Sequence, residues 1–288
     1  MPILPSDIAA IDDAAKNWRQ GDAFVDGGLD FVHVADLNRP LTAPSAEMAD
    51  AGFPTDENLT VIDSEGIGYV IVSQTCDVVR SCEIRPMLQV AALTTVDEET
   101  LDQVRHGFLV SLVYIPALAD RCLVADLDRL MTIEKSVLAA MPENSFVHGV
   151  TTDRDCRAFA ESVARRFARF AFPDDFVEAV GPIQKRIKEK HSRQSPEGQC
   201  YRTVREIRVA AAPSWEDPSP NIEFLFIVDE IAMGREEFDD IVASLIARFK
   251  ATGVFAEPSY RIISLENLSA AAYCASERLD LDYLSRAG

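Results

Sequence analysis

The first half of the chain is dominated by short runs of β-branched and aromatic residues, each bounded by glycine, proline, aspartate or asparagine. Such residues fit a pleated, half-buried surface, and the bounding residues commonly end strands. The runs span residues 21–34, 68–73, 87–95, 109–115 and 119–124. Several short strands at close intervals are typical of a closed barrel. We therefore expect an α+β protein that opens with a short helix and a small β-barrel.

Helical periodicity is stronger in the second half. Apolar residues recur at helical spacing over residues 236–252 and again before Pro173, where they predict the buried stripe of an arginine-rich helix. The residues of that stripe are Phe159, Val163, Phe167 and Phe170. Strand-like runs lie at 202–211, 222–228 and 260–265. This order predicts a helix-rich α+β sandwich, for which the ferredoxin-like fold is one arrangement.

The length of the chain favours two domains. At 288 residues it exceeds one average domain and can bury two modest cores. The stretch Met141-Pro142-Glu143-Asn144 is a break typical of a connection between domains. We therefore predict a boundary near 142–150, with the barrel domain in residues 1–145 and the α+β domain in residues 150–288.

The cysteines and the N-terminus indicate the compartment. The 6 cysteines lack the paired spacing of a disulfide framework or a zinc ribbon, and the acidic N-terminus lacks the basic start of a secretory signal. No apolar run reaches the roughly 20 residues of a membrane-spanning helix. We expect a soluble cytoplasmic protein with free thiols and no membrane association. The alternative to free thiols is a metal site, built from Cys76, Cys82, His106 and Cys122.

Several cofactor and catalytic motifs are missing from the sequence. It contains no HxH or HExxH pair and no GxSxG elbow. The glycines at 27–28 and 66–68 lack the strand-to-helix context of a nucleotide-binding loop. We expect no metal and no other cofactor.

Charge is distributed unevenly along the chain. The net charge is −19, and residues 1–150 carry 24 acidic side chains against 9 basic ones. An acidic surface repels phosphate at long range, so any contact with RNA or another polyanion must be local. The basic stretch lies within 151–208, where the candidate binding residues are Arg165, Arg166, Arg169, Lys185 and Arg186. The alternative is a solvated helix face whose arginines pair with nearby carboxylates.

A cluster of polar residues follows the second predicted strand. It consists of Ser73, Gln74, Thr75, Cys76 and Asp77. Polar side chains at a strand end are a common place for a site. Cys76 would need His33 or His106 as a base, because the neighbouring Asp77 carboxylate raises a thiol pKa. The alternative is a hydrogen-bonded turn with a small buried cysteine.

Four sequence blocks occur in a characteristic order. They are RQGDAFV at 19–25, GYVIVSQ at 68–74, MLQVAALTT at 87–95 and ADLDRLMTIEKSVL at 125–138. Together these blocks resemble the PemK/MazF family of toxins, and the last one is similar to the family's LDQLRTIDKSRL pattern. The resemblance covers about residues 19–138. It implies an SH3-like barrel, commonly a homodimer, that cuts single-stranded RNA without a metal.

The resemblance also implies roles for particular positions. In the family an arginine stabilises charge on the phosphate, and a threonine or serine helps to position it. Here Ile67 stands at the arginine position and Gly68 at that of the following proline, so the chain departs from the pattern. The threonine corresponds to Thr94 or Thr95. Arg80 and Arg85, on the loop after the second strand, are candidates to replace the arginine.

Three functions follow as hypotheses. The leading one is a PemK-like protein that binds RNA or another polyanion in a regulatory role, in a prokaryotic toxin-related or phage-defence context. The second is catalysis, either by a metal-independent endoribonuclease that uses Thr94, Thr95 and Arg80 or Arg85, or by a Cys76-dependent enzyme. The third is a scaffold whose long loop at 37–58 contacts a basic partner protein.

Overall fold

The chain divides into two compact units. The computed structural model describes residues 4–26, 29–52, 59–107, 109–229, 234–250 and 254–279. The units are Met1–Ala168 and Arg169–Gly288. The division therefore falls later than the predicted 142–150, because helix α6 (Asp153–Phe167) belongs to the first unit and buries Phe159 in its core.

The first unit is built on a six-stranded sheet with the strand order β6-β7-β5-β4-β1-β8. All of its neighbouring strands are antiparallel. The strands are β1 (Ala23–Val25), β4 (Gly68–Ile71), β5 (Met87–Thr95), β6 (Leu112–Tyr114), β7 (Leu123–Glu134) and β8 (Phe146–Val147). Within the described residues the end strands β6 and β8 do not pair, so the sheet is open and the predicted closed barrel is not confirmed.

Both faces of this sheet are buried, and alternation along each strand explains how. On β4, Tyr69 and Ile71 join one hydrophobic core, while Val70 joins the core on the opposite face. The first core is closed by helices α1 (Pro5–Ala15) and α5 (Ser136–Ala140), and the second by α6 and the 3-10 helix η1 (Pro116–Arg121). Strands buried on two faces read as continuous apolar runs, which is why the sequence marks them clearly.

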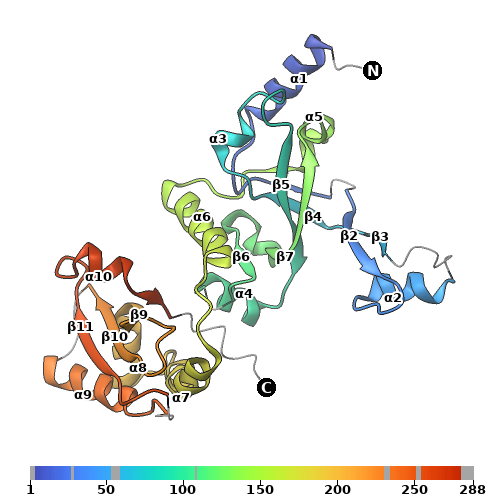
Figure 1. Cartoon of the computed structure of the whole chain (residues 1–288). Helices are drawn as coiled ribbons and strands as arrows, with labels where there is room; N and C mark the ends of the chain where they lie inside the picture. The colour runs from blue at the N-terminus through green and yellow to red at the C-terminus, as the bar shows by residue number, and fades with distance from the viewer. Residues whose placement is uncertain are drawn as a thin grey trace. The chain divides into compact units, whose positions relative to one another are not determined.

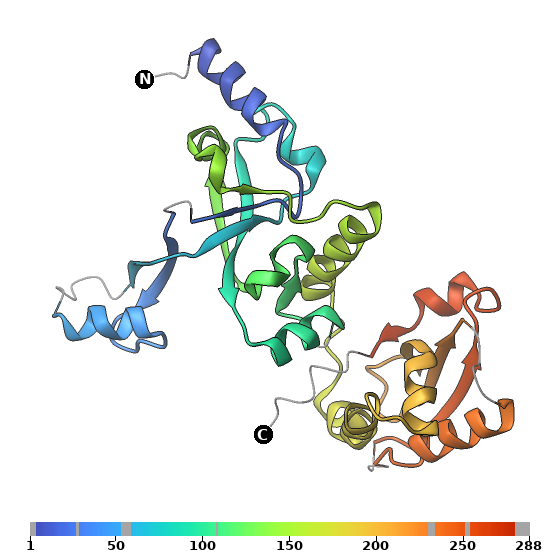
Figure 2. The ribbon, with the colours of Figure 1, turned by 180° about the vertical axis from the view of Figure 1, so that it is seen from behind.

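A two-stranded ribbon projects from the sheet between β1 and β4 (Figures 1 and 2). It pairs β2 (Phe31–Asp36) with β3 (Leu59–Ser64). The single strand predicted over 21–34 is therefore wrong, since Asp26 takes a left-handed conformation with φ 60° directly after β1. The predicted loop at 37–58 contains helix α2 (Ala43–Asp50), and its residues 53–58 lie outside the described part of the chain.

Three short elements complete the first unit. They are α3 (Thr75–Val78), α4 (Glu98–Arg105) and the 3-10 helix η2 (Glu143–Ser145). The strand predicted over 119–124 is wrong, because η1 occupies most of it and β7 begins only at Leu123. Strand β7 then continues to Glu134, through most of the sequence block at 125–138.

The second unit contains a four-stranded sheet with the order β11-β10-β9-β12. The strands are β9 (Val204–Ala212), β10 (Asn221–Val228), β11 (Ser259–Ile263) and β12 (Glu277–Arg278). Strand β10 is antiparallel to β9 and parallel to β11, to which helix α9 (Arg235–Ile246) connects it. Because β10 and β11 are direct neighbours, the split βαβ of a ferredoxin-like fold is not formed.

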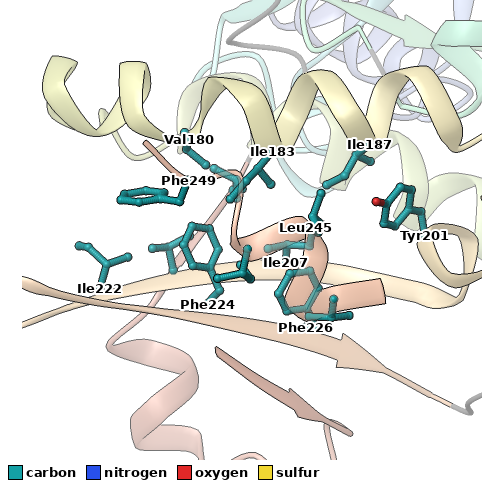
Figure 3. Close-up of a cluster of buried hydrophobic side chains, with 14 of the residues drawn as sticks. Val180, Ile183, Ile187, Tyr201, Ile207, Ile222, Phe224, Phe226, Leu245 and Phe249 are labelled. Carbon is teal, nitrogen blue, oxygen red and sulfur yellow. The ribbon is translucent and has the colours of Figure 1, made fainter. Parts of the chain in front are cut away.

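Helices cover both faces of the second sheet. The larger core lies beneath α7 (Asp174–Lys190), α8 (Pro196–Thr203) and α9, and α10 (Ala270–Cys274) packs on the other face. Figure 3 shows Val180, Ile183 and Ile187 of α7 pointing toward the strands. Their spacing of three and four residues is that of one helix face. The predicted α+β character of this part is therefore confirmed.

Candidate functional site

The predicted catalytic residues are not brought together. At one end of β5, the Gln89 N–H donates to Ser73 Oγ at 2.8 Å. Thr94 lies farther along the same strand, at a distance of about 16 Å for a rise of ~3.3 Å per residue. Thr95 follows at the same far end. Ser73, Gln74 and the turn after them therefore cannot share one site with the two threonines.

The turn at 73–80 is exposed and contains no paired base. The Cys76 thiol is exposed and donates to Gln74 Oε1 at 3.6 Å. Both predicted bases lie elsewhere: His106 follows α4, with Nδ1 2.8 Å from the Asp102 carbonyl, and His33 lies on the ribbon. Asp77 faces Arg85 at 3.7 Å. The geometry gives Cys76 no activating partner, and the buried cysteine of the alternative interpretation is also wrong.

Lys135 fixes this turn to the sheet. Its side chain is almost fully buried, and Nζ donates to the backbone carbonyls of Asp77, at 2.8 Å, and of Arg80. Burial lowers the pKa of Lys135, while the Asp12 carboxylate raises it. Asp12 itself accepts a 2.7 Å hydrogen bond from the Cys82 N–H. The polar turn is thus a rigid part of the scaffold, and Lys135 positions it.

The predicted polyanion-binding residues are mostly engaged inside their own units. Arg165 donates to the Gly107 carbonyl and Arg166 to Asp128, both within the first unit. Arg186 forms two hydrogen bonds with Glu197 in the second unit, at 2.6 and 2.7 Å. Lys185 is exposed on α7, and Arg169 is the first residue of the second unit. The basic stretch is therefore divided between the units, and three of its arginines already have partners.

The helix stripe predicted beside these arginines is only partly buried. Phe159 is buried in the core of the first unit, and Val163 packs against that core. Phe167, in contrast, has 60% of its surface exposed, and Phe170 lies in the second unit against Trp215. The stripe breaks where one unit ends and the next begins.

A different group of polar residues converges on the face of the first sheet that packs against α1. The register places Tyr69, Ala92 and Asp126 directly opposite one another across β4, β5 and β7. The register then shifts, because Ala91 pairs with Leu130, so β7 bulges between Asp126 and Leu130. Arg129 lies in this bulge. We call Tyr69, Asp126, Arg129 and the ring of Phe31 the Arg129 site.

Arg129 is the cation of this site. Its guanidinium carbon lies 4.7 Å from the centroid of the Phe31 ring. Within the described part of the chain, Arg129 makes no hydrogen bond and no ion pair, and it is half-buried. A half-buried charge normally acquires a partner, because removing it from water is costly. The guanidinium is therefore available to an anion from outside the chain.

The titratable neighbours of Arg129 are perturbed. The Tyr69 hydroxyl is buried without a hydrogen-bond partner, and burial raises the pKa of Tyr69 to about 12. Burial also raises the pKa of Asp126, against the charges of Arg129 and Arg166. Asp30 adds a further negative charge near Tyr69. Perturbed groups that cluster in this way mark candidate functional sites.

The Arg129 site adjoins the positions that the resemblance singled out. A Cβ on Gly66 would lie 2.9 Å from the Tyr69 hydroxyl, and one on Gly68 would lie 2.3 Å from the Phe24 carbonyl. This backbone therefore has no room for the family's proline at 68. Arg80 and Arg85 follow the opposite end of β4, and the cation whose charge acts on Tyr69 is Arg129 of β7. Sequence reasoning missed it although Arg129 stands within the block ADLDRLMTIEKSVL.

A second polar pair lies at the other end of β1. The Asp22 carboxylate is buried, with Oδ1 3.2 Å from His148 Nδ1 and Oδ2 accepting from the Arg19 N–H at 2.8 Å. Burial raises the pKa of Asp22, and its hydrogen bond with His148 opposes this. The His148 side chain is 57% exposed. A buried carboxylate that orients an exposed imidazole can support proton transfer. His148 was missed because it falls in the predicted interdomain segment.

Neither a metal-binding cluster nor a membrane-spanning helix occurs among the described residues. Among the residues that the structure describes, no group of three or more His, Cys, Asp or Glu side chains is arranged to hold a metal ion. No described helix combines the length and apolarity needed to cross a membrane. No family model, no curated protein and no solved structure matches the chain.

Proposed function

We propose that the chain is a PemK-like protein whose Arg129 site binds the phosphodiester backbone of single-stranded RNA without a metal. The context would be the toxin-related or phage-defence role that the resemblance implies. One observation carries the proposal, namely the half-buried guanidinium of Arg129, which forms no hydrogen bond or ion pair with the described residues.

The donor geometry suits a phosphate. A guanidinium presents parallel N–H groups that match two phosphate oxygens, and such charge-assisted bonds are stronger than neutral ones. The Tyr69 hydroxyl is buried, and its raised pKa keeps it protonated and uncharged, so it adds no negative charge near the bound phosphate. Thr94 lies two positions beyond Ala92 on β5, and so on the same face of the strand. It can provide a hydroxyl near the bound strand.

Carboxylates near Arg129 limit the affinity of the Arg129 site for RNA. Asp30 and Asp126 reduce the positive potential around Arg129, and the chain as a whole carries a net charge of −19. Binding should therefore depend on a few local contacts and weaken with salt. This explains how an acidic protein can select RNA without binding polyanions everywhere on its surface.

Fluorescence anisotropy tests the proposal. The full chain is titrated into a labelled single-stranded RNA of about 12 nucleotides, within the usual range of binding-site sizes. We expect Arg129→Ala to weaken binding about tenfold or more, and Arg129→Lys to lose part of the affinity. The control is Arg39→Ala, which removes an exposed arginine that pairs with Asp36. No binding by the wild type, or equal binding by Arg129→Ala, would refute the proposal.

RNA cleavage is a second candidate function, favoured by the Asp22–His148 pair. With its Nδ1 held by Asp22, His148 is oriented to exchange a proton through Nε2. Incubation of RNA with the wild type in the presence of a chelator should then produce fragments, and His148→Ala should abolish them. If RNA stays intact with the wild type, cleavage is rejected and the binding proposal is unaffected.

A further inference from the structure

The outer face of the β2–β3 ribbon is an apolar surface that no described element covers. The register places Val34 opposite Val61, Val32 opposite Asp63 and Leu59 opposite Asp36. These side chains share one face because residues alternate along each strand. The apolar members are exposed by 42% at Val32, 64% at Val34, 67% at Leu59 and 60% at Val61. We call these four residues the ribbon patch.

The opposite face of the same ribbon shows how such a surface is normally covered. Helix α2 contacts β3 there, Ile62 is fully buried, and His33 Nε2 reaches Thr42 Oγ1, at the start of α2, at 3.5 Å. Figures 1 and 2 show α2 lying beside the ribbon. A ribbon with apolar residues on both faces is stable when both are covered, and exposed apolar clusters commonly mark interaction sites.

Charge around the ribbon patch distinguishes between occupants. Asp30, Asp63 and Glu65 lie at the end of the ribbon nearest the sheet, and none forms an ion pair with the described residues. Asp36, at the other end, is paired with Arg39. A second copy of the chain would bring like charges together. Its four apolar side chains would also cover much less than the roughly 1,200 Å² of a stable interface.

We propose that the ribbon patch binds an amphipathic helix of a partner protein, with an apolar stripe flanked by lysine or arginine. The helix would cover the outer face as α2 covers the inner one, and its basic residues would pair with Asp63 and Glu65. Helices that lay an apolar face on a hydrophobic surface are a common mode of recognition. This inference is independent of RNA binding at the Arg129 site.

Two synthetic peptides provide the test. Both have about 18 residues, enough to form a helix, and carry leucine at helical spacing, but one is flanked by lysine and the other by glutamate. Calorimetry with the full chain should detect binding of the lysine peptide alone. The double variant Val34→Ser/Val61→Ser keeps the charge and should weaken binding at least about tenfold. Asp63→Asn should reduce the preference for lysine over glutamate.

Control variants distinguish binding at the ribbon patch from nonspecific binding to exposed apolar residues elsewhere. Val79→Ser removes a valine that is 44% exposed outside the ribbon and should leave peptide binding unchanged. Circular dichroism checks that each variant is folded, and sedimentation measures self-association. The proposal is overturned if neither peptide binds, if both bind equally, or if the double variant binds as well as the wild type. A wild-type dimer that the double variant abolishes would instead assign the patch to a second copy.

Discussion

Asp126 should make RNA binding at the Arg129 site depend on pH. Burial raises its pKa, whereas the hydrogen bond from the Asp128 N–H and the charges of Arg129 and Arg166 lower it, and the Asp128 carboxylate raises it again. A carboxyl with a raised pKa takes up its proton at a higher pH than an ordinary aspartate. Protonation removes the negative charge beside the phosphate-binding guanidinium, so RNA affinity should increase as the pH falls through the raised pKa.

The variant Asp126→Asn checks this prediction. It should bind RNA at neutral pH as tightly as the wild type does at the acidic end of the titration, and its affinity should vary less with pH. Anisotropy at constant ionic strength measures both. A wild-type affinity that is constant over the titration, or that falls with acidification, contradicts the role given to Asp126.

At the residue scale, the polar turn at 73–77 could be predicted from the sequence, but the Arg129 site could not. Ser73 to Asp77 are neighbours in the chain, so their cluster is visible in the sequence. Arg129 and Tyr69 become neighbours only through the register of β4, β5 and β7 and the bulge between Asp126 and Leu130. Long-range register depends on how distant segments pack, and the local sequence patterns that predict single strands do not reveal it.

At the element scale, strands and helices that lie wholly within a core were predicted best. Strand β5 was predicted over 87–95 and forms over Met87–Thr95. The helical spacing recognised over 236–252 corresponds to α9, which forms over Arg235–Ile246. The errors occur where the chain leaves the sheet, at the ribbon and at η1. There, turn geometry and tertiary contacts override the apolar pattern.

Gly68 and Gly181 give predictions of different size for the same substitution. A Cβ at Gly68 would lie 2.3 Å from the Phe24 carbonyl oxygen and 2.9 Å from Val25 Cα, whereas one at Gly181, inside α7, meets nothing within 4 Å. Backbone atoms cannot move aside cheaply, so Gly68→Ala should lower the free energy of unfolding by about 3 kcal/mol. Gly181→Ala should change it by less than about 1 kcal/mol, because the better helix propensity of alanine is opposed by crowding of its Cβ against the ring of Pro182.

Urea denaturation measures both changes, with each variant compared with the wild type at one temperature. A neutral Gly68→Ala would show that β1 and β4 can separate near the Arg129 site. That outcome would remove the steric reason for a glycine where the resembling family has proline.

At the scale of the whole molecule, the hydrophobic cores define two folding units. The cores of the first unit contain residues from Ala15 to Val163, and those of the second contain residues from Phe172 to Leu279. No buried cluster of the described residues includes both sets. Two domains were predicted, but the boundary was placed too early because Met141-Pro142 was taken as the linker. Phe159 then packs with the strands that precede it.

Separate cores predict separate unfolding transitions, and the chain carries a reporter for each. Of its 2 tryptophans, Trp18 is buried in the first unit, and Trp215 packs on Phe176 in the second. Phe176 is fully buried, so Phe176→Ala should lower the free energy of unfolding of the second unit by about 3–5 kcal/mol. The unfolding transition reported by Trp215 fluorescence should move to a lower urea concentration, and the transition reported by Trp18 should stay where it is.

Lys135→Met is the matched change in the first unit. It leaves the carbonyls of Asp77 and Arg80 without the Lys135 donor. The free energy of unfolding reported by Trp18 should therefore fall by about 2 kcal/mol, while that reported by Trp215 should not change. Trp215→Phe and Trp18→Phe backgrounds isolate the two signals. Because each substitution touches one core, a shift of both transitions by either variant would mean that the units unfold as one cooperative body.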